Sequence, residues 1–580
     1  MSDEREQVAE LAKRRGFFLP AAEAYGGVSG FYTYGPRGAA LKRAIESAWR
    51  DRFITREGHM EIAGPDIMPE PVFRASGHLD GFEDLVIECT SCDSSHRADH
   101  LIEEATQIAD AESMSAQALE ALVAEHELAC PTCGASLAAS PVEGFNLMFE
   151  TGIGPGATQP GYLRPETAQG IFVEFPMLKQ YARGQLPFAV GQIGTAWRNE
   201  ISPRRSLTRV REFTQAELEH FIDPDRDEPP LERVADVELR LAPATAQASG
   251  GADLELMSVA RAVETETVEP WVAYYLGVSQ EWYERVGVDM GRFRFRQHLN
   301  GELAHYATDC WDAEAEVAGD WVEISGFAYR ADYDLSKHAE HSDAEFSVFR
   351  PFDEPRRVER ATVDPDMSIL GPAHGDAATA IAAALERLAE EDPAAFDGES
   401  VALEVDGTTY EIDTEVANFS VDTVTETGEQ ITPHVIEPSF GIGRILYTVL
   451  SHALQTDEIE GERRTLLGLP ASVAPTTVGV FPLMDKDGMG ELARTVSSQL
   501  RTAGLSVEYD DSGNIGRRYR RQDEIGTPYC VTIDYESLEE STVTVRDRDS
   551  TAQARVDIER LPGRLQALRA GSLTVDALGE

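Results

Sequence analysis

Lysine is scarce in this 580-residue chain, which has 5 lysines beside 46 arginines and 102 acidic residues, and a formal charge of −51. In dilute salt, such an excess of carboxylate would strain a compact fold by self-repulsion. At about 1 M salt the Debye length is about 3 Å, which screens most of that repulsion. The composition therefore predicts a protein adapted to molar salt, as in a halophile, and a generically acidic surface is the alternative.

Cysteine and long apolar runs are also sparse. Six cysteines exclude a disulfide scaffold, and no apolar run approaches the roughly 20 residues that span a bilayer. The N-terminal segment MSDEREQVAELAKRRG is charged and lacks the apolar centre of a signal peptide. We therefore expect a cytoplasmic protein. An isoelectric point near 4.5 argues against nucleic acid as a partner, although high salt weakens this argument because local contacts then decide recognition.

The length predicts three or four domains, and 42% hydrophobic residues exclude a disordered acidic polymer. Residues 38–56 predict an amphipathic helix. Residues 340–432 have the texture of an insertion, with a helix at about 376–391 and a hairpin turn at Asp406-Gly407. Alternating strands and helices over 475–580 predict a small, separate α/β domain.

Arginine is concentrated in one short segment of this acidic chain. Within 14 residues stand Arg198, Arg204, Arg205, Arg209 and Arg211. Strand-like segments flank SPRRSLT, which predicts a hairpin with Arg198 near Arg211. A guanidinium fork matches phosphate oxygens, and Phe213 offers a flat face for a purine. An exposed basic loop beside an ordinary hairpin is the alternative.

A second motif, Gly441-x-Gly443-Arg444, opens a predicted helix. Two glycines let backbone approach a ligand closely, and an arginine then enters the helix. The motif is weak by itself, because glycines also serve tight packing. It does not fit the dinucleotide fingerprint, which needs three glycines after a strand.

Four of the six cysteines form two spaced pairs. They are Cys89-x-x-Cys92 and Cys130-x-x-Cys133. Two such turns can supply four thiolates to a tetrahedral zinc ion, and reduced free thiols are the alternative. The 37 residues between the pairs exceed the roughly 15–20 of a compact zinc ribbon. Residues 85–145 therefore predict an elaborated insertion, helical at about 102–127.

Seven further segments stand in order along the chain: FYTYGPRGAALK, ASGHLDGFEDL, LRPETAQGIF, AWRNEISPR, REFTQAELEHF, VEISGFAYRADYDL and HVIEPSFGIGR. Together they resemble glycyl-tRNA synthetases of the archaeal and eukaryotic dimeric type, which are class II aminoacyl-tRNA synthetases. The helix ending near Pro65 resembles motif 1 of that class, the hairpin from Trp197 to Phe213 resembles motif 2, and Gly441 to Arg444 resembles motif 3. The resemblance covers most of residues 16–450.

The resemblance implies an α/β (α+β) fold. Its class II catalytic core would have a seven-stranded, mostly antiparallel sheet with flanking helices, plus insertions and a C-terminal α/β anticodon-binding domain. The implied divisions are the catalytic core at 1–84 with motif 1, at 146–339 with motif 2 and at 433–470 with motif 3, insertions at 85–145 and 340–432, and the anticodon-binding domain at 475–580. A homodimer is implied as well.

Site residues follow from the resemblance by position. Arg198 and Arg444 would be catalytic, holding the α- and γ-phosphates. The implied ATP site is Arg198, Asn199, Glu200, Thr208, Arg209, Val210, Arg211, Glu212, Phe213, Glu323, Ile324, Gly441, Ile442, Gly443 and Arg444. The implied glycine site is Arg97, Glu166, Phe213, Gln215, Glu217, Arg330, Glu437 and Ser439. Within these sets Glu200 would contact adenine, and Glu323 would help hold Mg²⁺.

The carboxylates of this set suit glycine, which offers no side chain to hold. Carboxylates can surround its ammonium group, and a closed site rejects any added Cβ. The substrate that a pocket rejects poorly is one smaller than its own, and no amino acid is smaller than glycine. No editing domain is therefore expected. Taken singly, each carboxylate also suits a structural ion pair.

The implied activity is that of a glycine–tRNA ligase. ATP activates glycine to glycyl-adenylate, and the glycyl group passes to the 3′ end of tRNA(Gly), with Mg²⁺ as cofactor and zinc as a structural metal. Neither DNA nor a membrane is an expected partner. The alternatives are a class II synthetase of the threonyl or prolyl type, and a non-catalytic synthetase-like accessory subunit. No general base is assigned.

Three remaining features have structural interpretations. Cys310 and Cys530 lie in apolar or strand-like segments, which is typical of buried small hydrophobic residues. His434 and the other histidines lack ligand spacing, so structural roles are expected. The basic cluster Arg517–Arg521 suits either a contact with tRNA or a solvated helix face, and both interpretations stay open.

Overall fold

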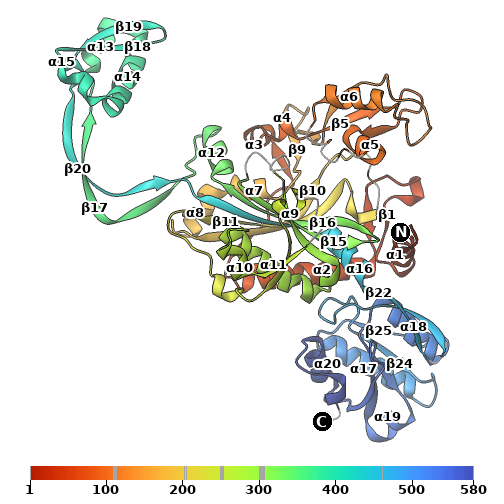
Figure 1. Cartoon of the computed structure of the whole chain (residues 1–580). Helices are drawn as coiled ribbons and strands as arrows, with labels where there is room; N and C mark the ends of the chain where they lie inside the picture. The colour runs from red at the N-terminus through yellow and green to blue at the C-terminus, as the bar shows by residue number, and fades with distance from the viewer. Residues whose placement is uncertain are drawn as a thin grey trace. The chain divides into compact units, whose positions relative to one another are not determined.

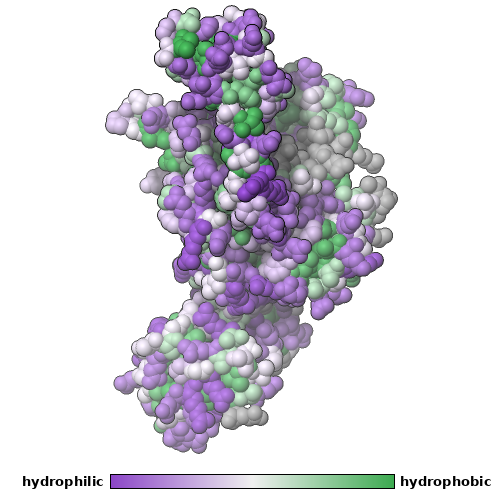
Figure 2. Space-filling model, turned by 90° about the vertical axis from the view of Figure 1, so that its left-hand side faces the viewer, coloured by the Kyte–Doolittle hydropathy of each residue, from purple (hydrophilic) through white to green (hydrophobic). Residues whose placement is uncertain are grey.

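The computed structural model describes all residues except 1, 107, 109–110, 112–113, 202, 204–205, 249–253, 300–306, 460 and 579–580. The chain divides into two compact units, Met1–Phe346 with Pro433–Glu580, and Ser347–Thr432. Arg204 and Arg205 of the arginine cluster lie outside the described residues. Within the described part of the chain, no helix is long and apolar enough to cross a membrane. Figure 2 shows mostly hydrophilic residues on the visible face, with hydrophobic residues in small patches.

The first unit is built on one large sheet (Figure 1). Among the described residues its strand order is β13 (Glu255–Ser258), β12 (Glu238–Ala242), β14 (Phe293–Gln297), β15 (Asp309–Val317), β16 (Asp320–Ala331), β21 (His434–Gly441), β11 (Glu212–Ile222), β10 (Phe188–Trp197) and β3 (Met60–Ile62). Only the β12–β14 and β10–β3 pairs are parallel, so the mostly antiparallel character is confirmed. The expected count of seven is wrong, because short strands β13 and β3 add one edge on each side.

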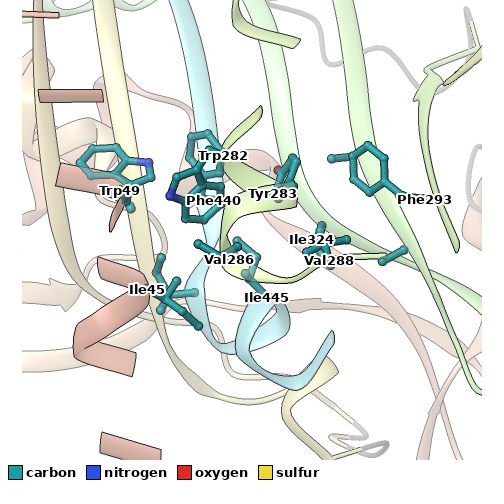
Figure 3. Packing of buried hydrophobic residues seen from close by; sticks show 14 of the residues in the cluster. Ile45, Trp49, Trp282, Tyr283, Val286, Val288, Phe293, Ile324, Phe440 and Ile445 are labelled. Atoms are coloured by element: carbon teal, nitrogen blue, oxygen red, sulfur yellow. The ribbon is translucent and has the colours of Figure 1, made fainter. Parts of the chain in front are cut away.

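Aromatic side chains pack the helices onto one face of this sheet. Helix α2 (Pro36–Trp49) continues as a π-helical segment (Arg50–Thr55) and buries Trp49 and Phe53, which confirms the helix predicted over 38–56. The ring of Phe53 lies 4.8 Å from that of Phe440 on β21. Figure 3 shows Trp49, Trp282 and Phe440 gathered at this face, with Trp282 contributed by α11 (Pro270–Val286). Because side chains alternate along a strand, Glu437, Ser439 and Gly441 face the other way.

Residues 85–145 form a three-stranded sheet with two helices. The strands are β5 (Glu83–Glu88), β6 (Ser95–Arg97) and β7 (Val142–Asn146), and the helices are α5 (Ala98–Ala105) and α6 (Ala116–Glu125). The single helical stretch expected at 102–127 is therefore wrong. The side chain of Ser115 accepts a hydrogen bond from the backbone N–H of Ala118, which starts a new helix there.

Residues 475–580 hold a five-stranded sheet in the order β25 (Val507–Tyr509), β24 (Val478–Pro482), β26 (Tyr529–Ile533), β27 (Thr542–Asp547) and β28 (Gln553–Asp557). Its first three strands are parallel, as the βαβαβ alternation predicts. The cluster Arg517–Arg521 lies on α18 (Ile515–Ile525). There Arg518 is buried and donates to the carbonyl oxygens of Asp511 and Gly513, so part of the cluster is structural.

The second unit consists of a long hairpin and a small globular part. The hairpin is β17 (Val348–Thr362) with β20 (Ser420–Ile431). The globular part packs α14 (Ala378–Glu391) against a second hairpin, β18 (Ser400–Val405) with β19 (Thr408–Asp413). Asp406 and Gly407 have φ of 53° and 73°. Two successive positive φ values are typical of a type I′ turn, which confirms the predicted hairpin.

Candidate active site

A cavity of about 220 Å³ lies on the sheet face opposite to the aromatic core. It brings together sixteen of the predicted site residues, from β11, β16, β21, the 3-10 turn Ser206–Thr208 and the start of α16 (Ile442–Ala453). They are Glu166, Arg198, Glu200, Thr208, Arg209, Val210, Phe213, Gln215, Glu217, Glu323, Ile324, Glu437, Ser439, Gly441, Gly443 and Arg444.

The arginines at one end of the cavity are held by backbone carbonyls and rings. Arg198 donates from Nε to the carbonyl of Pro165 at 3.1 Å, and its guanidinium lies 5.4 Å from the ring centre of Phe213. Arg444 donates to the carbonyls of Thr208 at 3.0 Å and Glu323 at 2.9 Å. These contacts restrain both guanidinium groups before any ligand binds, which is how preorganised phosphate-binding groups act.

The predicted hairpin is confirmed by strand pairing. Strands β10 and β11 are antiparallel with Trp197 opposite Glu212, and the N–H of Arg198 donates to the carbonyl of Arg211 at 3.0 Å. Arg209 forms an ion pair with Glu200 at 2.6 Å. The carboxylate of Glu323 pairs with Arg444 at 3.0 Å, and this positive charge lowers the pKa of Glu323. The cationic end is thus lined by paired charges that a polyphosphate could rearrange.

The other end of the cavity is rich in carboxylates. The side chain of Glu217 accepts hydrogen bonds from the N–H of Thr167 at 2.7 Å and from the hydroxyl of Ser439 at 2.7 Å. Burial and the neighbouring carboxylate of Glu166 raise the pKa of Glu217. Although burial opposes it, the pKa of Glu166 is lowered by His78 and by Arg330. This end can hold a small cation such as an ammonium group.

Arg330 lies behind this carboxylate end instead of lining the cavity. It bonds to Glu437 at 2.6 Å and to Asp334 at 2.7 and 2.8 Å, and all three side chains are at most 10% exposed. Sequence reasoning missed Asp334, although its position four residues after Arg330 could have suggested the pair. It also missed Glu219, which is fully buried and whose burial raises its pKa well above the usual range.

Five further predicted residues lie outside the cavity. Arg97 is held on β6 by ion pairs with Asp84 and Asp99, and it lines a neighbouring cavity of about 720 Å³. Ile442 is buried in the aromatic core, and Glu212 is exposed. The remaining two make backbone contacts: Asn199 donates its N–H to Leu147, and the Arg211 side chain donates to the carbonyls of Glu200 and Ser29.

The four paired cysteines meet in one cluster. Their Sγ atoms all lie within 4.8 Å of one another, with Cys89 to Cys133 at 3.6 Å and Cys92 to Cys130 at 3.7 Å. A tetrahedral zinc ion with Zn–S bonds of about 2.3 Å requires sulfur–sulfur distances of about 3.8 Å. The donor set therefore fits zinc.

The two remaining cysteines differ from each other. Cys530 is buried, as predicted. Cys310 is only partly buried and lines the active-site cavity, so its expected burial is wrong. The reason is that β15 carries Cys310 on the ligand-facing side of the sheet, opposite Ala328 of β16.

Comparison with known proteins agrees with this architecture. A family model described as an anticodon binding domain matches residues 477–568. The crystal structure of prolyl-tRNA synthetase from Cryptosporidium parvum, complexed with halofuginone and AMPPNP, has the same fold, with a TM-score of 0.50 and 12% identity over 97% of this chain and 77% of that one. The large antiparallel sheet and the C-terminal domain are those of a class II aminoacyl-tRNA synthetase.

Sequence relatives narrow the class to one family. The chain is 49% identical to the glycine–tRNA ligase of Methanothrix thermoacetophila, over 100% of this chain and 99% of the relative. It is 45% identical to that of Thermococcus gammatolerans, over 98% and 99%. The chain belongs to the glycine–tRNA ligase family.

Proposed function

We propose that this cavity activates glycine with ATP and then supplies the glycyl group to the 3′ end of tRNA(Gly). The observation that carries the proposal is that a single cavity joins a carboxylate cage to three arginines. Glu166, Glu217 and Glu437 would surround the ammonium of glycine. An amino acid with a side chain would have to displace buried, hydrogen-bonded groups. The cationic end would bind ATP, with Phe213 under the adenine.

The first step is an in-line attack by the glycine carboxylate on the α-phosphorus of ATP, with pyrophosphate as the leaving group. Arg198 and Arg444 would stabilise the charge that develops on the phosphoryl oxygens. Glu323 lines the cavity beside Arg444 and is a suitable oxygen ligand for Mg²⁺. When bound, Mg²⁺ would neutralise phosphate charge. In the second step a ribose hydroxyl of tRNA attacks the glycyl carbonyl, and AMP leaves.

The test is ATP–pyrophosphate exchange in about 2–3 M KCl, where the acidic surface is screened. Glycine should support exchange, and alanine, serine, proline and threonine should not. Exchange with proline or threonine would favour the alternative class II specificities. A folded protein without exchange would favour the non-catalytic accessory type, against which both arginines in the cavity already argue.

The KM for glycine should fall as the pH rises to about 8. Burial and the neighbouring carboxylates raise the pKa of Glu437 to about 8, although Arg330 opposes the shift. The ammonium of glycine needs an ionised cage, so below that pH binding must expel a proton. KM should therefore rise up to about tenfold for each pH unit below the pKa. Steady-state exchange between about pH 6 and 9 measures this, and Glu437→Gln should flatten the profile. A flat wild-type profile would contradict the prediction.

A structural zinc ion is the second metal that we propose, held by the four clustered cysteines. Elemental analysis of purified protein should find one zinc per chain. Cys92→Ser should lose the metal and lower the melting temperature, because metal-binding free energy contributes to folding in such sites. Cys530→Ala is the matched control, since it alters a buried cysteine far from the cluster in sequence. A zinc-free wild type that melts at the same temperature would contradict the proposal.

The predicted domain divisions are part of the same proposal, supported by the separate unit Ser347–Thr432 and by the match at 477–568. A salt-adapted cytoplasmic enzyme is proposed from the charge of −51 and from its need for ATP and tRNA. A homodimer is proposed as well. In the described sheet β3 is an edge strand, and such an edge offers unpaired backbone groups to a second copy. Light scattering in molar KCl should give about twice the 63.6 kDa chain mass.

A further inference from the structure

One wall of the active-site cavity has no role in the mechanism above. It is formed by His298, Cys310, Gly326 and Ala328. Gly326 on β16 pairs with Ser439 of β21 on one side and with Asp312 of β15 on the other. The wall therefore continues the sheet surface outward from the glycine-binding end. A substrate group on this wall would lie next to the reacting glycine.

His298 is held in place by a carboxylate behind it. Its Nε2 lies 2.9 Å from Oδ2 of Asp312, whose side chain is 15% exposed. Although burial opposes a charge on the ring, the hydrogen bond to Asp312 raises the pKa of His298 to about 11. The imidazolium form carries an N–H on both nitrogens. Among the residues that the structure describes, Nδ1 has no hydrogen-bond partner, so this donor is available to a ligand.

Gly326 is not required by the packing of the protein. A Cβ built on it would meet one protein atom within 4 Å, Oδ1 of Asp312 at 3.9 Å, and its φ is not in the left-handed region. Gly194 differs, since a Cβ there would lie 2.1 Å from the guanidinium of Arg164. The missing side chain at Gly326 therefore leaves open space in the cavity, and it is a bound substrate that would need this space.

The ribose is the part of the nucleotide that still lacks a partner. In the proposed function, Glu200 and Phe213 bind the base, and arginines bind the phosphates. The open wall lies between the two ends of the cavity. His298 lowers the pKa of Glu323 at the cationic end, and Glu437 at the carboxylate end raises that of Cys310. Hydroxyl oxygens accept hydrogen bonds from an imidazolium, and a sugar ring needs an unobstructed floor.

We propose that His298, positioned by Asp312, donates a hydrogen bond from Nδ1 to a ribose hydroxyl of an adenosine whose sugar lies over Gly326. This inference rests on the proposed function. Two adenosines enter the cavity in that reaction, one in ATP and one at the 3′ end of tRNA. They share the ribose diol, so the experiment has to tell the two sources apart.

The experiment compares wild type, His298→Ala and His298→Asn in two assays. One is ATP–pyrophosphate exchange with ATP, 2′-deoxy-ATP and 3′-deoxy-ATP. The other is single-turnover transfer from preformed glycyl-adenylate to tRNA ending in adenosine or in either deoxyadenosine. Asparagine keeps an N–H donor near the position of Nδ1. His434→Asn is the matched control, because His434 bonds to Tyr329 and does not line the cavity.

Loss of a charged hydrogen bond to ribose should cost His298→Ala about 10- to 100-fold in kcat/KM with the natural substrate, and little with the deoxy substrate that lacks the bonded hydroxyl. His298→Asn should recover part of the loss. An effect confined to exchange assigns the subsite to ATP, and one confined to transfer assigns it to tRNA. Gly326→Ala, which the fold can accept, should weaken the same step.

Unchanged discrimination between natural and deoxy substrates in both assays would overturn the inference, as would wild-type kinetics in Gly326→Ala. Both results leave the proposed function intact, because wild-type exchange with glycine is measured in the same series. Absence of exchange in the wild type would instead overturn the proposed function, and the subsite with it.

Discussion

Replacing Arg198 with alanine should lower glycine-dependent ATP–pyrophosphate exchange by about 10³-fold. The Arg198 side chain lines the cavity, lies against Phe213 and is anchored to the carbonyl of Pro165. Its charge is thus fixed where negative charge develops on the α-phosphate. Alanine leaves water to stabilise that charge, and water must reorganise during the reaction. The loss should appear mainly in kcat, because the interaction strengthens in the transition state.

The matched control is Arg261→Ala, which removes an exposed arginine paired only with the exposed Glu264 among the contacts of the described residues. Its exchange rate and melting temperature should equal those of the wild type, because exposed ion pairs contribute little to stability. Arg444→Ala should fall with Arg198→Ala. A fully folded Arg198→Ala enzyme that keeps more than about a tenth of wild-type exchange would contradict the proposed role.

Replacing Arg330 with alanine should destabilise the catalytic unit by about 3–5 kcal/mol and abolish measurable glycine saturation. Arg330 is the cation that Asp334 and Glu437 share, and the side chains of all three are nearly inaccessible to water. Removing it leaves two buried carboxylates without their partner. They must then take up protons or admit water, and the ammonium-binding cage loses its shape. Urea unfolding followed by tryptophan fluorescence, together with exchange at increasing glycine concentration, measures both effects.

A compensated variant separates folding from function. In Arg330→Met with Asp334→Asn and Glu437→Gln, no buried charge is left unpaired, so much of the lost stability should return. Activation of glycine should not return, since a carboxylate of the cage is missing. Wild-type stability of the Arg330→Ala single variant would show that the buried ion pairs do not support the fold as we infer.

Several local features could be predicted because neighbouring residues carry them. The hairpin from Trp197 to Phe213 follows from two strand-like segments around a polar turn, and its pairing is observed. Asp406-Gly407 forms the expected turn for the same reason. The cysteine pairs predicted a tetrahedral sulfur cluster, because each CxxC turn brings two thiolates together. The roles of these residues in binding stay predictions until the variants are measured.

Other features depend on which strands become neighbours. The chain gave no sign that β16 lies between β15 and β21, so it could not show that Gly326 lies between Ser439 and Asp312. The same limit hid His298 and left Cys310 mistaken for a buried residue. Arg97, expected with the glycine residues, is held elsewhere by Asp84 and Asp99.

The sequence by itself determined the family, the class of fold and the set of charged residues, because ordered motifs and hydrophobic patterns are properties of local stretches of chain. Only the tertiary structure decided which charges meet. Arg330 and Glu437 are 107 residues apart in sequence yet bonded at 2.6 Å. Such distances are set by strand order and register in the sheet, and the packing of the whole core selects these.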